Sequence, residues 1–274
     1  MTCDPLAAAC SDALGVQHPP ADDDPRIVSL VPSITELLFY LGLGEQVVGR
    51  TSFCIHPEAA LANVPRVGGT KTLRMDKLRA LRPSHVIVNI DENRQEDVEP
   101  IAAFAPHIVV THPLVPDDNL ALYRLVGGIF GKQQEAERLC VAFQQARDEL
   151  AEASAMLPIR RVLYLIWRDP WMTVSRDTYI AQMLALANWQ TVCHDPEVRY
   201  PEVRADEKLL ANTDMVLFSS EPFPFKATHI DEWRQLSGDT RTPCAFIDGE
   251  MTSWYGNRAV EGLRYLRKLA AQFS

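Results

Sequence analysis

Aromatic residues gather at two places in the second half of the sequence where loops and strand ends are expected. One tract contains Trp167 and Trp171, and the other contains Trp254 and Tyr255. Large flat ligands gain binding free energy when they stack on such rings and bury apolar area. These four residues and Tyr200 are therefore candidates for the walls of a ligand site. The alternative for each ring is ordinary packing in the core or at the edge of a lobe.

Polar loops follow two predicted strands, at residues 85–90 and 215–219. Asn89 lies where the first of these loops begins, and Glu221 lies in the second. Ligands of α/β proteins usually bind at the carboxyl ends of strands, so both side chains are candidate ligand contacts. The alternative is that the polar residues of these loops cap the helices that follow.

Cys54 and His56 form a Cys-x-His pair in a stretch that we expect to be extended. Alternation along an extended chain places both side chains on one face, and a thiolate with an imidazole suits a transition metal. Two ligands do not close a metal site, however, and His112 and His194 stand at no fixed spacing from the pair. The alternative is a loop cysteine beside a hydrogen-bonded histidine.

Motifs typical of enzymes are missing from the sequence. It contains no G-x-S-x-G elbow, no phosphate-binding G-x-x-x-x-G-K and no H-E-x-x-H. Asp248 and Glu250 are the kind of carboxylate pair used in acid/base catalysis, but a single D-G-E is common in turns. We therefore expect a binding protein rather than an enzyme, with no catalytic residues and no catalytic cofactor.

The second half of the chain repeats the order of the first half. Residues 76–89 (DKLRALRPSHVIVN) and 206–219 (DEKLLANTDMVLFS) each begin with an aspartate, continue as a short helix and end in an apolar strand. Alternating strands and helices indicate βαβ units and mostly parallel sheets. Between the halves, residues 133–157 contain no Gly or Pro and have apolar residues at three- and four-residue steps, which predicts one long amphipathic helix ended by Pro158.

We therefore expect an α/β protein with two Rossmann-like lobes joined by one long backbone helix. The predicted parts are a poorly ordered leader at 1–24, an N-terminal lobe at 25–132, the helix at 133–158 and a C-terminal lobe at 159–274. Two lobes of similar build leave a cleft between them, which is a favoured place for a small molecule. A monomer is expected.

Net charge and hydropathy limit which classes of partner and which cellular compartment we expect for this protein. The net charge of -9 argues against nucleic acid, because binding to phosphates requires clustered Lys and Arg. No apolar run reaches the roughly 18 residues of a membrane span. The leader contains no basic residue and no long apolar run, and the six cysteines show no paired spacing. We expect a cytoplasmic protein, or a periplasmic one if the true start lies upstream.

Three segments together resemble a known family. RIVSLVPSITELLFYLGLGEQVVGR (26–50), GGTKTLRMDKLRALRPSHVIVN (68–89) and residues 200–219 resemble the helical-backbone group of cobalamin and iron-chelate substrate-binding proteins of ABC importers. The resemblance covers about residues 26–272. It implies two α/β lobes bridged by a stiff helix, small motion on binding, and a metal chelate such as a corrinoid, haem or an iron-siderophore complex as the ligand.

The resemblance also implies roles for four residues. In the cobalamin-binding members, one acidic residue per lobe begins a helix and docks onto the permease, and these positions fall on Asp76 and Asp206 here. A single axial ligand to the metal of the chelate would come from His56 or His112. The alternative for the two aspartates is that they only stabilise their helix N-termini.

We expect a binding protein that holds a metal chelate in the cleft between its lobes. Among the metal chelates, a corrinoid is the favoured ligand. An ABC permease is the partner that the resemblance implies. The first alternative is a cytoplasmic sensor or carrier of such a chelate that works without a transporter. The second is an uncharacterised enzyme on the same scaffold.

Overall fold

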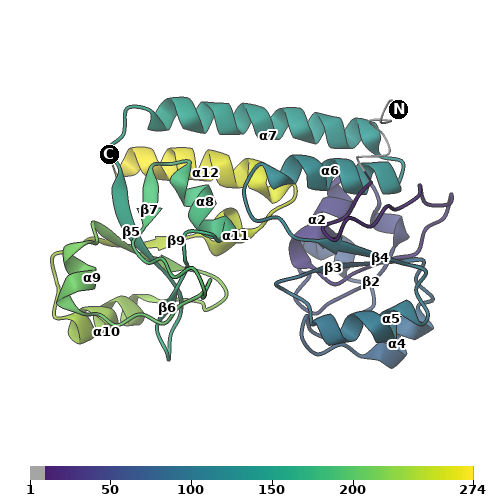
Figure 1. The fold of residues 1–274 in the computed structure, drawn as a ribbon, viewed down its shortest axis with the longest axis horizontal. Coiled ribbons are helices and arrows are strands. Elements are labelled where there is room, and N and C mark those ends of the chain that lie inside the picture. Colours follow the sequence, from purple (N-terminus) through teal and green to yellow (C-terminus); the bar gives the residue numbers. More distant parts are fainter. Residues whose placement is uncertain (1–9, 274) are drawn as a thin grey trace. The chain divides into compact units, whose positions relative to one another are not determined.

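The computed structural model describes residues 10–273, and these form two compact units (Figure 1). Unit 1 comprises residues 10–113, 117–142 and 255–257, and unit 2 comprises residues 114–116, 143–254 and 258–273. The boundary therefore falls inside the long helix, between residues 142 and 143, where we expected a separate helical part at 133–158. The short segment 255–257 belongs to unit 1 although it lies far along the chain.

Unit 1 is a parallel sheet with helices. The strand order is β2-β1-β3-β4, and each neighbouring pair is parallel. Its elements are β1 (Ile27–Ser29), α2 (Pro32–Tyr40), η1 (Gly44–Gln46), β2 (Val47–Arg50), α3 (Glu58–Leu61), α4 (Met75–Ala80), β3 (His85–Asn89), η2 (Gln95–Asp97), α5 (Val98–Ala102), β4 (His107–Thr111), α6 (Asp118–Ile129) and the first part of α7 (Gln133–Ser154).

Burial in unit 1 follows the apolar pattern of the sequence. All five residues of β3 are buried, as expected for a strand of a parallel sheet that is covered on both faces. Val28, Val86 and Val110 of three strands pack in one cluster with Leu78 of α4 and Ile101 of α5. This face of the sheet and the helices α4 and α5 therefore share one core.

Part of the leader packs on unit 1, which differs from the poorly ordered leader that we expected. The Asp12 carboxylate is fully buried and accepts hydrogen bonds from His18 Nε2 (3.1 Å) and from the amide N–H of Val110 (3.1 Å). The amide N–H of Ala13 donates to the carbonyl oxygen of Val110 at 2.9 Å. Because β4 is an edge strand, residues 10–24 supply partners for its unpaired backbone groups. Residues 1–9 of the predicted leader lie outside the described residues.

Unit 2 repeats the parallel sheet with one addition. The strand order is β6-β5-β8-β9, β7 also pairs with β5, and only the β5–β6 pair is antiparallel. Its elements are the rest of α7, β5 (Arg160–Trp167), β6 (Met172–Thr173), α8 (Tyr179–Ala185), β7 (Trp189–Thr191), α9 (Glu207–Ala211), β8 (Met215–Ser219), α10 (Ala227–Ser237), β9 (Cys244–Ile247), α11 (Gly249–Ser253) and α12 (Arg258–Gln272).

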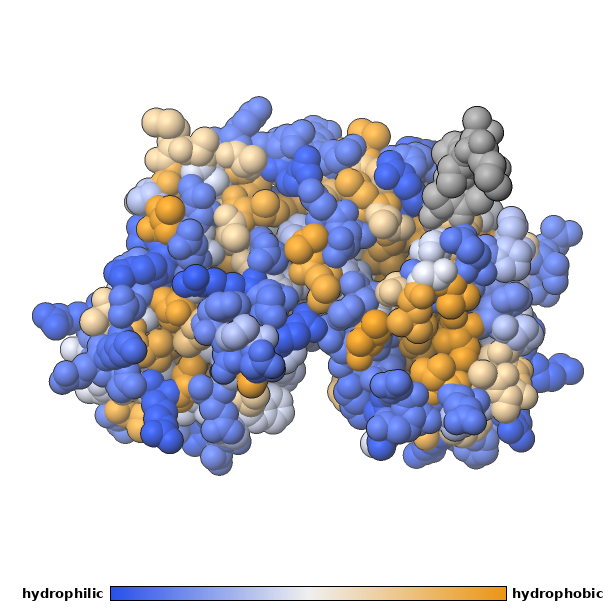
Figure 2. Space-filling view, in the orientation of Figure 1, coloured by the Kyte–Doolittle hydropathy of each residue, from blue (hydrophilic) through white to orange (hydrophobic). Residues whose placement is uncertain are grey.

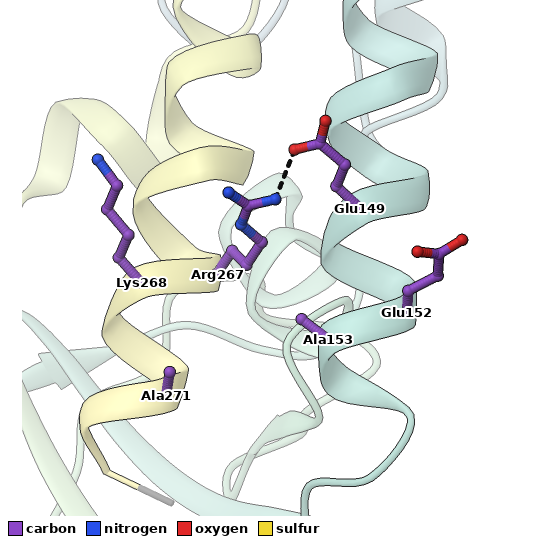
Figure 3. Close-up of a pocket in the computed structure, with 6 residues that line it drawn as sticks. All are labelled: Glu149, Glu152, Ala153, Arg267, Lys268 and Ala271. Carbon is purple, nitrogen blue, oxygen red and sulfur yellow. Dashed lines mark hydrogen bonds and ion pairs between the residues drawn. The ribbon is translucent and has the colours of Figure 1, made fainter.

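Helix α7 ends at Ser154, three residues before the predicted end at Leu157. Pro158 has no amide N–H to donate to the Ser154 carbonyl oxygen, and Asn188 Nδ2 donates instead to the carbonyl oxygens of Ser154 (2.6 Å) and Leu157 (3.0 Å). Within unit 2, α7 lies beside α12, and Arg267 forms an ion pair with Glu149 across the groove between them (Figure 3).

The prediction of an α/β fold with mostly parallel sheets is confirmed by these two units. No helix within residues 10–273 is long and apolar enough to cross a membrane. The five cysteines in the same part of the chain are all free thiols, whereas Cys3 lies outside it.

Candidate functional site

Exposed apolar side chains mark the carboxyl edge of the sheet in unit 1. Phe53 follows β2 and is 60% exposed, and Ile90 follows β3 and is 45% exposed. Because parallel strands end at one edge, the loops that carry these residues belong to the same side of the sheet, where α/β proteins bind ligands. Phe53 was missed by the sequence analysis, and it lies three positions after the end of β2 at Arg50.

The loop after β3 is held by its own asparagines. Asn89 is buried, and its Oδ1 accepts hydrogen bonds from the amide N–H groups of Asp91 (2.8 Å) and Glu92 (3.3 Å). Asn93 Oδ1 in turn accepts from the amide N–H of Asn89 at 2.8 Å. Lys71 Nζ donates to the carbonyl oxygen of Asp91 at 2.8 Å. Asn89 thus fixes the backbone of this loop, and its direct contact with a ligand stays a prediction.

A groove of about 690 Å³ adjoins this loop in unit 1. It is lined by residues of the leader, of β3 and β4 and of the segment that leads into α5, and Figure 2 shows an apolar area over these strands. The lining residues are Leu14, Val88, Asn89, Ile90, Asn93, Arg94, Gln95, Glu96, Val98, Glu99 and Val110. Since Asn89 and Ile90 are among them, the groove is continuous with the loop after β3.

The two candidate axial histidines both lie in loops of unit 1. His112 follows β4, and its Nε2 lies 3.5 Å from the Asp91 carboxylate. His56 is half-buried in the loop between β2 and α3. The role of either residue as an axial ligand stays a prediction.

Cys54 has the environment of a structural thiol. It is fully buried, and its Sγ lies 3.0 Å from Thr35 Oγ1 and 3.1 Å from Thr51 Oγ1. Burial raises the pKa of the Cys54 thiol, so the protonated form dominates at neutral pH. Metal binding requires the thiolate. The described residues contain no group of three or more His, Cys, Asp or Glu arranged to hold a metal ion. The structure therefore favours the alternative to the predicted Cys54 and His56 metal site.

Tyr255 contributes to unit 1 from the C-terminal half of the chain. Its hydroxyl donates to Glu92 Oε1 at 2.6 Å, and the ring is only 7% exposed. Burial and the nearby Glu92 carboxylate raise the pKa of Tyr255 well above its ordinary value, so the hydroxyl remains a hydrogen-bond donor. Tyr255 is thus packed against the loop after β3 and does not present its face to solvent.

Two of the predicted aromatic residues are exposed in unit 2. Trp167 ends β5, is 40% exposed and packs edge-to-face on Phe223, with ring centroids 5.7 Å apart. Phe223 follows β8, so the two rings come from neighbouring strands at their carboxyl ends. Tyr200 is 39% exposed, and the Arg199 guanidinium lies 5.8 Å from its ring. Trp167 and Tyr200 remain available for stacking.

Trp171 is partly buried and packs against an aromatic core cluster. It stacks on Phe225 with centroids 5.7 Å apart and an interplanar angle of 7°, and it meets Trp233 edge-on at 5.1 Å. Phe218 of β8 packs on the same ring. The structure therefore favours core packing for Trp171, which was the alternative to its predicted role as a ligand wall.

Glu221 and Trp254 form a network with a partly buried ion pair. Trp254 Nε1 donates to Glu221 Oε2 at 3.0 Å, and the Arg258 guanidinium lies over the Trp254 ring at 4.9 Å. Arg258 also pairs with Glu250 at 2.9 Å. Burial raises the pKa of Glu221, and the carboxylates of Glu250 and Asp248 raise it further, whereas the bond from Trp254 lowers it. Trp254 is 8% exposed, so its ring is enclosed by this network.

The two predicted docking aspartates are exposed at helix N-termini. Asp206 is the N-cap of α9, and its side chain accepts a hydrogen bond from the amide N–H of Leu209 at 2.8 Å. Asp76 lies in the first turn of α4, whose N-cap is Arg74. Both carboxylates therefore stabilise their helices and still face solvent.

Comparisons with known proteins agree with this architecture. The chain is 26% identical over 190 residues to the vitamin B12-binding protein of Pectobacterium atrosepticum, which covers 67% of each chain. It is 23% identical over 206 residues to the vitamin B12-binding protein of Yersinia pestis, covering 73% of this chain and 71% of the relative.

Solved structures show the same fold at low sequence identity. The periplasmic vitamin B12 binding protein of Vibrio cholerae superposes with a TM-score of 0.76 at 18% identity, covering 90% of this chain and 98% of the other. The periplasmic heme-binding protein of Roseiflexus sp. RS-1 gives a TM-score of 0.77 at 24% identity, covering 91% and 98%.

The family profile described as periplasmic binding protein matches residues 27–237. That match includes the loops at the strand ends of both units described above. The relatives and the superposed structures are named as binding proteins, which confirms the prediction that the chain is not an enzyme. The family resemblance of the sequence is confirmed as well: this chain belongs to the periplasmic binding protein family.

Proposed function

We propose that this protein binds a metal chelate as the substrate-binding component of an ABC importer, and that the chelate is a corrinoid. The observation on which this rests is the set of exposed aromatic and apolar side chains at the carboxyl edges of the two parallel sheets, with Phe53 and Ile90 in unit 1 and Trp167 in unit 2. Flat macrocycles gain most from such surfaces. The relatives named for vitamin B12 support a corrinoid over haem.

Loss of an exposed ring should weaken binding without unfolding the protein. We expect Trp167→Ala and Phe53→Ala each to raise the Kd for cobinamide about tenfold, since a stacking aromatic contributes about 1–3 kcal/mol. Titrations of cobinamide, cobalamin and haem followed by absorbance measure this effect. Tyr40→Ala, which removes a 57% exposed ring on helix α2, is the matched control and should leave the Kd unchanged.

The wild-type titration also separates the candidate ligands. Tight binding of haem alone would replace the corrinoid with an iron porphyrin as the ligand. If none of the three compounds binds, or if Trp167→Ala and Phe53→Ala bind as well as the wild type, the proposed ligand class is wrong.

The exposed carboxylates of Asp76 and Asp206 are the proposed contacts with the permease. Neutralising both, with Asp76→Asn and Asp206→Asn, should lower corrinoid uptake by cells roughly tenfold, because the charge complementarity with a basic permease surface is lost. Ligand affinity should stay the same. Glu207→Gln, one residue along α9, is the matched control. Uptake that is insensitive to the double change would favour a carrier or sensor that works without a transporter.

A further inference from the structure

Two neighbouring residues make hydrogen bonds to acidic residues of two different strand-end loops. Trp254 Nε1 donates to Glu221 Oε2 at 3.0 Å, and Glu221 lies in the loop after β8. The Tyr255 hydroxyl donates to Glu92 Oε1 at 2.6 Å, and Glu92 lies in the loop after β3. The first contact lies entirely within unit 2 and the second entirely within unit 1. Because Trp254 and Tyr255 are consecutive in the sequence, one peptide bond links the Trp254–Glu221 contact of unit 2 to the Tyr255–Glu92 contact of unit 1.

The Trp254 side of this pair is fixed within unit 2. The Arg258 guanidinium covers its ring at 4.9 Å, a distance at which a cation is attracted by an indole face. Arg258 is itself fixed by Glu250 at 2.9 Å, and the two side chains are only 13% and 19% exposed. An ion pair with so little solvent around it is screened weakly. The indole N–H is therefore held in the direction of Glu221.

The Tyr255 side is fixed within unit 1 through the next residue. The amide N–H of Gly256 donates to Asn119 Oδ1 at 2.7 Å, and the Tyr123 hydroxyl donates to the carbonyl oxygen of Gly256 at 2.9 Å. Gly256 has a φ of +85°, and a Cβ there would lie 3.2 Å from the carbonyl oxygen of Ser33. Only glycine suits this position. The backbone of the segment is thus anchored to α6 and α2, and the Tyr255 hydroxyl is aimed at Glu92.

We propose that Trp254 and Tyr255 are positioning residues that hold the ligand loops of both units and couple them to each other. Neither ring is exposed enough to be a wall of the ligand site, at 8% and 7% exposure, so their contribution to affinity passes through Glu221 and Glu92. A change that makes one loop more mobile then also makes the other loop more mobile, because the two residues share a peptide bond. The effect on affinity rests on the function proposed above, whereas the effect on the loops does not.

Hydrogen exchange of the ligand-free protein tests the coupling directly. Tyr255→Phe removes the hydroxyl that donates to Glu92 and also neighbours Ser33. We expect exchange of the amides at residues 90–95 to become about tenfold faster, with a smaller acceleration at residues 220–223. Trp254→Phe removes the donor to Glu221 and should give the reverse order. Tyr40→Phe, at an exposed tyrosine of unit 1, should change neither loop. Acceleration confined to the loop of the altered residue, or seen in neither loop, would overturn the proposal.

Conservative replacements of the acceptors separate positioning from general destabilisation. Glu92→Gln keeps an oxygen that accepts from Tyr255, so exchange at residues 90–95 should remain slow, whereas Glu92→Ala should match Tyr255→Phe. Glu221→Gln and Glu221→Ala should behave in the same way for residues 220–223. Equal acceleration by the Gln and Ala variants would contradict the role of the hydrogen bond.

Cobinamide titration then tests the consequence for binding. Tyr255→Phe and Trp254→Phe should each raise the Kd several-fold, and the double variant should raise it by less than the product of the single effects, because the two residues act together. Unchanged affinity in variants whose loops exchange faster would overturn the positioning role. If the wild type itself does not bind cobinamide, the proposed function fails, and the exchange measurements still decide whether the two loops are coupled.

Discussion

Replacement of Trp171 by alanine should lower the free energy of unfolding of unit 2 by about 3–5 kcal/mol. The ring stacks on Phe225 and meets Trp233 and Phe218 edge-on, so its removal leaves a cavity between three aromatic side chains. Cavities of this kind cost both the transfer free energy of the ring and the contacts of its neighbours. Chemical denaturation followed by fluorescence of the remaining tryptophans measures the change.

Trp167→Ala is the matched control for this prediction. Trp167 lies four residues earlier, is 40% exposed and meets Phe223 edge-on. Its removal should cost less than about 1 kcal/mol of stability, as is usual for exposed positions, while it weakens ligand binding. A Trp171→Ala protein that unfolds like the wild type but binds cobinamide poorly would reverse the two roles and return Trp171 to the wall of the ligand site.

The sequence allowed the architecture to be predicted because the periodicities involved are local. The apolar strands at 85–90 and 215–219 and the helix from Gln133 are visible in short windows of sequence, and the structure contains them as β3, β8 and α7. The distinction between Trp167 and Trp171 is not local. It depends on Phe225 and Trp233, more than fifty residues further along, which pack on the Trp171 ring and bury part of it, whereas Trp167 is 40% exposed.

The leader is a second feature that local sequence did not predict: it was expected to be poorly ordered, and part of it is packed on unit 1. Its acidic, proline-rich composition favours disorder, and composition was the only local signal. Residues 10–24 find partners on the free edge of β4, through Val110, and on α6, where the amide N–H of Ala21 donates to the carbonyl oxygen of Ile129 at 2.7 Å. That edge exists only once the strand order β2-β1-β3-β4 is known. Asp12 is buried because Val110 and His18 bring donors to it, and none of these pairings has a sequence signature.

A buried histidine makes the stability of unit 1 depend on pH. His85 begins β3, is 3% exposed, stacks on His107 at 4.7 Å and meets Phe130 edge-on at 5.0 Å. Its Nδ1 lies 2.9 Å from Ser84 Oγ, and its Nε2 has no hydrogen-bond partner among residues 10–273. Burial, together with the neighbouring His107 and His18, lowers the pKa of His85 to about 4, although Asp22 opposes the shift.

The sign of the effect follows from proton binding in the two states. The unfolded chain binds a proton at His85 near pH 6.5, whereas the folded protein resists doing so until about pH 4. The contribution of this group to stability is therefore complete above pH 6.5 and is lost as the pH falls through this window. Linkage gives a loss of about 3 kcal/mol between pH 7 and pH 4.

His85→Phe should remove this part of the pH dependence, because phenylalanine keeps a flat ring against His107 and Phe130 but binds no proton. We expect the free energy of unfolding of the variant to fall by about 3 kcal/mol less than that of the wild type between pH 7 and pH 4. Urea denaturation at closely spaced pH values gives both curves. His194→Phe changes an exposed histidine and should keep the pH dependence of the wild type. Parallel curves for wild type and His85→Phe would mean that His85 is protonated in the folded protein as readily as in the unfolded chain.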